Sequence, residues 1–183
     1  RYLLSTAWDV STAAFSQVYS VAGQELTPNG IAFNTDGTTM FIVGQASPID
    51  VSQYALATGF DFTSVSYTGA FSVISEFSAP QGLVFNPTGT KMFVIGSSTD
   101  RIGEYSLTTP FSVISGVSIV QYFDVSNEGT NPKDLAFNPD GTKMFVIDNS
   151  RDVNQYSVGT KLTPTGYHPV HTTNSTDTEY WTD

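Results

Sequence analysis

The sequence predicts an all-β fold in which four-stranded antiparallel sheets are arranged as the blades of a β-propeller. The first observation is a repeated segment: PNGIAFNTDGTTMFIVG begins at Pro28, PQGLVFNPTGTKMFVIG at Pro80 and PKDLAFNPDGTKMFVID at Pro132. These copies lie 52 residues apart. The second is a shorter echo downstream of each copy, and the third is the even scatter of Gly and Pro. Four strands recurring every ~40–50 residues indicate a propeller, because a blade buries its two apolar faces only against neighbouring blades.

The first two strands of each unit are expected to form a hairpin. Short apolar runs at 31–33, 83–85 and 135–137 form strand A. Each ends at a turn with Asn at its start and Gly at its end, where Gly supplies the positive φ that such a turn needs. Strand B follows as runs that are apolar on both faces, which places it centrally in the blade: 40–43, 92–95 and 144–147.

The third and fourth strands come from the echo and the segment after it. Strand C carries a tyrosine that recurs as Tyr54, Tyr105 and Tyr156, with Tyr2 opening the chain in the same motif. We expect these tyrosines to be core residues between blades. A connector with a bulky aromatic follows (Trp8, Phe60 and Phe111), which we expect to pack between neighbouring units. Strand D comes last, around 14–21, 66–74 and 117–125.

This reading gives about three and a quarter blades over residues 1–160. They are a partial blade (1–22), two complete blades (28–74 and 80–125) and a second partial blade (132–158). Because a propeller needs at least about four blades to close, the ring is expected to be completed by missing sequence or by other protein chains. We favour a fragment of a longer polypeptide. Residues 161–183 are interpreted as a linker or part of a small C-terminal module.

Composition excludes several classes of function. The formal charge of −10 argues against binding to nucleic acid, which requires clustered Lys and Arg. No apolar run is long enough to span a bilayer, so membrane insertion is not expected. The chain has no cysteine, which excludes disulfides and thiolate metal sites.

The blade text, P-x-G-[IL]-A-F-N-x-D-G-T-K-M-F-V followed by Q-Y-x-L and W-D-V-S-T-A, resembles repeats of marine phage and metagenomic β-propeller proteins. The resemblance covers about 1–160. It implies an extracellular or virion location and a structural or attachment role. The tail, with Gly-Tyr-His-Pro-Val-His and then Glu-Tyr-Trp, is similar to the closing half of a chitin-binding-type module. That similarity implies that Tyr167, Tyr180 and Trp181 stack on sugar rings; otherwise the segment is a polar linker.

One recurrence of carboxylates is a candidate binding feature. Glu25, Glu76 and Glu128 each lie three or four residues before the proline that opens a blade. They fall in the loop between strands D and A, near the mouth of a propeller's central channel, where a carboxylate ring could hold a cation or hydrogen-bond a glycan. The alternative is that they only keep the surface hydrated.

Catalysis and cofactors are not expected. The two histidines, His168 and His171, lie in the tail, and a nucleophilic triad needs such a base near Ser, Thr or Cys. No third ligand accompanies them, so we predict no metal site. The hypotheses are therefore a non-catalytic module of a phage or virion appendage that contacts protein or host glycan, a secreted or cell-surface glycan-binding protein of a marine bacterium, and a propeller enzyme of the lactonase or lyase type.

Overall fold

The computed structural model describes residues 1–158, which form an all-β array of antiparallel sheets. Blade 1 is the two-stranded sheet β1 (Tyr2–Leu4) and β2 (Ala13–Phe15), joined through a 3₁₀ turn at Val10–Thr12. Blade 2 contains β3 (Pro28–Phe33), β4 (Thr39–Gly44), β5 (Asp50–Leu56) and β6 (Val65–Ser72). Blade 3 contains β7 (Pro80–Phe85), β8 (Lys91–Gly96), β9 (Arg101–Leu107) and β10 (Val117–Asp124). Blade 4 contains β11 (Asp134–Phe137), β12 (Lys143–Ile147) and β13 (Val153–Ser157).

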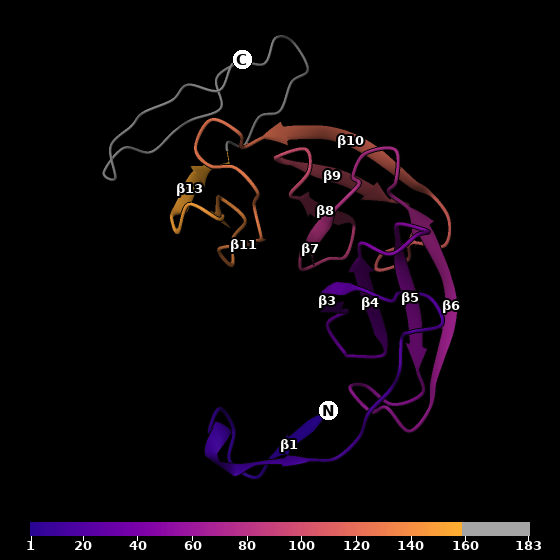
Figure 1. Cartoon of the computed structure of the whole chain (residues 1–183). Helices are drawn as coiled ribbons and strands as arrows, with labels where there is room; N and C mark the ends of the chain where they lie inside the picture. The colour runs from indigo at the N-terminus through magenta and orange to yellow at the C-terminus, as the bar shows by residue number, and fades with distance from the viewer. Residues whose placement is uncertain (159–183) are drawn as a thin grey trace.

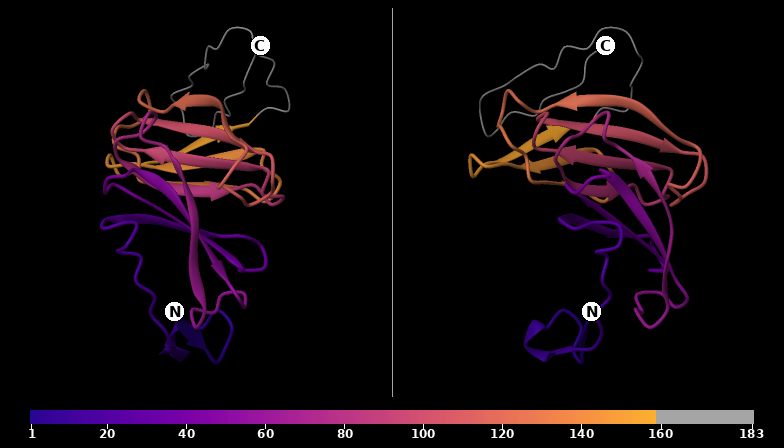
Figure 2. Two further views of the ribbon diagram at one scale, coloured as in Figure 1. Left: turned by 90° about the vertical axis from the view of Figure 1, so that its right-hand side faces the viewer. Right: turned by 45° about the vertical axis from the view of Figure 1, so that its right-hand side comes forward.

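The blades are meanders that succeed one another around an arc. Strands in blades 2 and 3 pair in the order A-B-C-D, and blade 4 shows A-B-C. Figure 1 shows the blades fanning around an arc, with blade 1 at one end and blade 4 at the other, and Figure 2 shows the same arc from two further sides. The predicted fold class is confirmed, and no helix among residues 1–158 has the length and apolarity to cross a membrane.

The hairpin between strands A and B is held by its own side chains. In blade 2 the backbone N–H of Thr39 donates to Asn34 Oδ1 at 2.9 Å, and that of Thr38 donates to Asp36 Oδ1 at the same distance. Gly37 has φ of +73°, as the turn reading requires. The bond from the Thr38 hydroxyl, and then that from its backbone, lowers the pKa of Asp36.

We predict that the hairpin carboxylates titrate below their ordinary range. The pKa of Asp140 in blade 4 is lowered in the same way, by the hydroxyl and backbone of Thr142. A lowered folded-state pKa stabilises the fold above the unfolded value of about 3.9, and this contribution is lost as the pH falls through the folded value. Carboxyl-detected NMR should give midpoints below 3.8 for both residues. The control is the amide chemical shift of Thr90 over the same pH range, because blade 3 has Thr88 in place of the aspartate. Aspartate midpoints near 4 would contradict the prediction.

The aromatic residue of the connector caps the hairpin of its own blade, which corrects the expectation for Phe60, whereas Phe111 also packs against the core between blades 2 and 3. Phe60 has φ of +57° and its N–H donates to the carbonyl of Gly37 at 2.9 Å. A Cβ on Gly37 would lie 2.3 Å from the Phe60 ring, so only glycine fits beneath it. Phe111 makes the same bond to Gly89 in blade 3. Trp8, the equivalent residue in blade 1, is 98% exposed, because the described part of blade 1 includes no hairpin for it to cap.

The core lies between the blades, because alternate residues of each strand face opposite neighbours. Phe41 of blade 2 meets Phe85 of blade 3 with ring centroids 4.5 Å apart. One blade further on, Phe93 meets Phe137 at 4.6 Å. The recurrent tyrosines of strand C are buried, which confirms that they are core residues: Tyr54, Tyr105 and Tyr156.

Candidate functional site

The predicted glutamates lie in three successive loops between strand D of one blade and strand A of the next. Glu25 precedes β3, Glu76 precedes β7 and Glu128 precedes β11. Within residues 1–158 no group of three or more histidine, aspartate or glutamate side chains is close enough to hold a metal ion. The described structure therefore does not bring the three glutamates together as one cation site, and each of them has a local partner.

Glu25 is a buried carboxylate that caps backbone amides. Its Oε1 accepts hydrogen bonds from the N–H of Thr27 at 2.7 Å and from the N–H of Ala46 at 3.0 Å, and the Thr27 hydroxyl lies at 3.2 Å. These donors belong to the loop before β3 and the loop after β4. Glu25 therefore ties together two loops of blade 2, which suits a structural role.

Glu76 and Glu128 occupy a different repeat position from Glu25. Both lie four residues before the blade-opening proline, where blade 2 has Gln24. In two blades this residue accepts from the tyrosine of strand C: the Tyr54 hydroxyl lies 3.4 Å from Gln24 Oε1, and the Tyr156 hydroxyl lies 3.1 Å from Glu128 Oε2. In blades 2 and 4 the residue at this position thus recurs as the hydrogen-bond acceptor of the strand C tyrosine.

Blade 3 departs from this arrangement. The Tyr105 hydroxyl is buried without a hydrogen-bond partner, and Glu76 accepts instead from the Ser75 hydroxyl at 2.7 Å. Burial raises the pKa of Tyr105 well above its usual range, and the nearby Glu76 raises it further. In blade 2, burial raises the pKa of Tyr54 to about 12. Both phenols are neutral at physiological pH.

Arg101 occupies the space near Glu76 and was not singled out by the sequence reading. One of its terminal nitrogens donates to the Glu76 carbonyl at 2.7 Å, and its guanidinium lies 4.2 Å from the centroid of the Tyr122 ring. The repeat contains a signal for it, because blades 2 and 4 have aspartates at this position, Asp50 and Asp152. Arg101 and the unpartnered hydroxyl of Tyr105 thus distinguish blade 3 from blades 2 and 4.

We predict that Arg101→Ala lowers the free energy of unfolding by about 1–3 kcal/mol, through loss of the ring stacking and the charged hydrogen bond. Arg151→Ala is the matched control, because Arg151 is exposed, and it should change stability by less than about 0.5 kcal/mol. Urea denaturation of both variants measures the difference. Equal stabilities would show that the Arg101 contacts contribute nothing.

A second departure in blade 3 is a buried carboxylate on strand C. Glu104 accepts from Lys91 Nζ and from Gln121 Nε2, each at 2.6 Å. Blades 2 and 4 have Gln53 and Gln155 at this position. In blade 2 the glutamine reaches the next blade, where its Oε1 accepts from the Val113 N–H at 2.8 Å. Glu104 of blade 3 instead forms an ion pair within its own blade.

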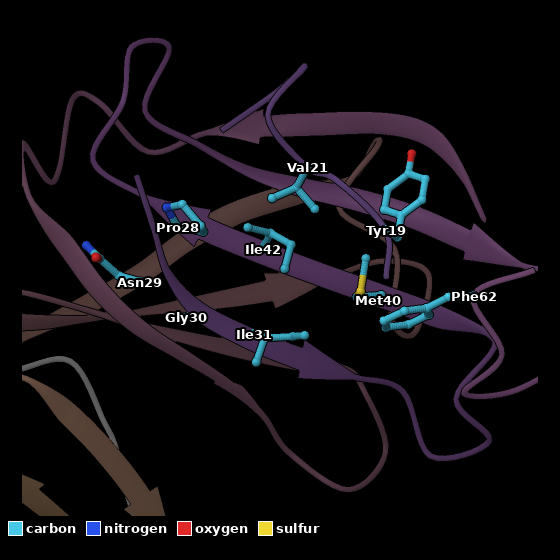
Figure 3. Close-up of a pocket in the computed structure, with 9 residues that line it drawn as sticks. All are labelled: Tyr19, Val21, Pro28, Asn29, Gly30, Ile31, Met40, Ile42 and Phe62. Atoms are coloured by element: carbon cyan, nitrogen blue, oxygen red, sulfur yellow. The ribbon is translucent and has the colours of Figure 1, made fainter. Parts of the chain in front are cut away.

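An apolar cavity of about 290 Å³ lies on blade 2 (Figure 3). It opens on the side of β3 and β4 that faces blade 1, and Tyr19 and Val21 from the segment after β2 cover it only in part. The lining residues are Tyr19, Val21, Pro28, Asn29, Gly30, Ile31, Met40, Ile42 and Phe62. No charged side chain lines it, so the cavity suits an apolar occupant.

The predicted sugar-stacking residues Tyr167, Tyr180 and Trp181 lie outside the described residues. So do the tail histidines, His168 and His171. The structure therefore bears only on the blade residues among the predicted candidates.

Comparison with solved structures identifies the fold. The chain is similar to a proposed 6-phosphogluconolactonase from Bacteroides uniformis, with 16% identity, a TM-score of 0.56, and coverage of 92% of this chain and 52% of that one. It is also similar to a proposed 6-phosphogluconolactonase from Bacteroides fragilis, with 14% identity, a TM-score of 0.55, and coverage of 81% of this chain and 38% of that one. A chain of a nidogen/laminin complex has 16% identity and a TM-score of 0.50, and the match covers 71% of this chain and 44% of that one. The chain thus spans about half the length of these proteins or less.

No family model matches the sequence, and no curated protein matches it. At these identities the structural neighbours establish the propeller fold alone. They include proteins named for lactonase activity and a protein from a binding complex, and one fold carries both.

Proposed function

We propose that this chain is a non-catalytic structural or attachment module of an extracellular or virion assembly, such as a phage appendage, that contacts protein or host glycan. The observation that carries the proposal is the use of loop carboxylates as backbone caps. Glu25 caps two loops, and Asp36 and Asp140 hold hairpins. Such loops present a rigid, hydrated surface rather than reactive groups.

The direction of the shifted aspartate pKa values supports this proposal. Among residues 1–158, every aspartate with a resolved shift has a lowered pKa, and hydrogen bonds from hydroxyls and backbone amides are the chief cause: Asp9, Asp36, Asp61, Asp124 and Asp140. A carboxyl that acts as a general acid or base near neutral pH needs the opposite shift. These aspartates stay ionised and suit structural bonds.

A lactonase is the second candidate, favoured by the names of two structural neighbours. The test is hydrolysis of 6-phosphogluconolactone, followed by proton release at constant pH, with buffer alone as the control. Under the first proposal the rate with protein equals the rate without it. A rate that increases in proportion to protein concentration would overturn the non-catalytic proposal.

A glycan array tests the attachment role directly. The full chain should bind at least one class of glycan if it meets host sugars, and replacing Tyr167, Tyr180 and Trp181 by alanine should abolish binding if the tail supplies the stacking rings. Retained binding would assign the sugar contact to the blades, as either a virion protein or a secreted glycan-binding protein could use them. No binding by either chain would exclude the glycan arm and leave contact with protein.

A further inference from the structure

The interface between blades is built twice from the same repeat positions. The forward face of a blade meets the next blade along the chain, and in blade 2 its apolar positions on the first three strands are Ala32, Phe41, Val43 and Val51. The rear face meets the preceding blade, and its four positions in blade 3 are Leu83, Phe85, Met92 and Val94. The forward face of blade 3 meets the rear face of blade 4 in the same way.

The rear face of blade 2 has no complete partner among the described residues. Ile31 is 56% exposed, whereas Leu83, its equivalent in blade 3, is 4% exposed. The cavity of about 290 Å³ lies on this rear face, next to Ile31, Met40 and Ile42 (Figure 3). In the two complete interfaces this space is filled by strands A and B of the preceding blade, and the described part of blade 1 has only the C and D strands.

The forward face of blade 4 is the matching surface. Ile147 is 44% exposed and Val153 is 67% exposed, whereas the equivalent residues of blade 3, Ile95 and Ile102, are buried. Phe145 is half-buried, and it corresponds to Phe41 and Phe93 in the complete interfaces. One chain therefore carries both halves of an interface that it already forms twice internally.

We propose that the open forward face of blade 4 docks on the open rear face of blade 2 of a second copy of this chain. Such a contact joins two different surfaces, and a contact of this type generates a closed ring when its rotation closes. Two copies close the ring, because one copy covers 52% of the length of the solved propeller from Bacteroides uniformis. In Figure 1 blade 4 lies at one end of the arc, and at the other end blade 1 lies beyond blade 2.

Docking requires one local adjustment. Strand β13 of the second copy takes the place that β1 holds in the single chain, because both are strands of the C type. β1 has three exposed residues and pairs with β2 through only three positions. It is therefore the element that gives way, while Tyr19 and Val21 stay packed on blade 2. This inference does not depend on the proposed function.

The test is the mass in solution of the full chain and of three variants, by light scattering after size exclusion. Wild type should have twice the monomer mass of 19.7 kDa. Ile31→Asp damages the rear face and Ile147→Asp damages the forward face, and each should raise the dissociation constant at least about 100-fold. Ile74→Asp is the matched control, because Ile74 is similarly exposed and lies outside both faces, and it should remain dimeric.

Mixing the two damaged chains sharpens the test. The Ile31→Asp chain keeps an intact forward face, and the Ile147→Asp chain keeps an intact rear face, so a mixture should form a heterodimer through one intact interface. Circular dichroism checks that the variants remain folded. A monomeric wild type, or a dimer unaffected by both substitutions, would overturn the proposal. Long polymers would overturn the two-copy ring.

Discussion

Replacing Phe41 by alanine is expected to lower the free energy of unfolding by about 3–5 kcal/mol, the usual cost of removing a buried aromatic ring. Phe41 is fully buried between blades 2 and 3, and its ring centroid lies 4.5 Å from that of Phe85. Truncation removes apolar burial and leaves a cavity between two sheets that cannot easily collapse. Urea denaturation monitored by circular dichroism measures the change.

Phe145→Ala is the matched control for this prediction. Phe145 has the same repeat position in blade 4, but it lies half-buried on the open forward face. Its truncation should cost less, about 1–2 kcal/mol, because less apolar area returns to water. The comparison is made at concentrations where the chain is monomeric, since docking of a second copy would bury Phe145. Equal costs for the two variants would contradict the assignment of the core to the interfaces between blades.

The second large effect is expected from exchanging a carboxylate between two chain positions. Three residues before the blade-opening proline, blades 2, 3 and 4 have Glu25, Phe77 and Gly129. At the end of strand B the same blades have Gly44, Gly96 and Asp148. A large residue at one position thus always meets glycine at the other. A Cβ on Gly44 would lie 2.4 Å from the carboxyl carbon of Glu25, and one on Gly129 would lie 1.5 Å from Asp148 Oδ2.

The two carboxylates also cap equivalent amides. Glu25 Oε1 accepts from the N–H of Ala46, and Asp148 Oδ1 accepts from the N–H of Ser150 at 2.7 Å, the same position in its blade. Blade 4 therefore supplies from strand B the carboxylate that blade 2 supplies from the loop. We infer that either position can serve the loop, but not both at once.

Gly44→Asp is expected to destabilise the chain by about 2–4 kcal/mol, through crowding and repulsion between two carboxylates. Glu25→Gly should cost about 1–3 kcal/mol, because the amides of Thr27 and Ala46 lose their acceptor. The double variant reproduces the blade 4 arrangement and should recover most of the loss, with a coupling energy of about 2 kcal/mol. Additive losses in the denaturation cycle would show that the two positions do not share one space.

Much of the blade could be predicted because its signals are local. Turn chemistry places Gly37, Gly89 and Gly141 at positive φ, and the structure has all three there. The apolar runs and their 52-residue period predict the strands and their antiparallel pairing. The burial of the strand C tyrosines followed from the same repeat.

The candidate site was less predictable, because a side chain's partner depends on neighbouring loops. Glu25 and Glu76 lie in equivalent loops but one repeat position apart, and one caps amides within blade 2 whereas the other lies beside Arg101 in blade 3. The prediction that Phe60 packs between blades was also wrong, because the positive φ of Phe60 turns its ring onto Gly37 of its own blade.

The amino-acid sequence alone determines the blade, its period and its two apolar faces, because these follow from turn residues and from the alternation of side chains along each strand. Only the tertiary structure decides which faces are left open, which tyrosine lacks a hydrogen-bond partner and where each carboxylate points. The physical reason is that burial and hydrogen bonding between blades join residues about 50 positions apart, such as Phe41 and Phe85, whose separation and orientation are set by packing.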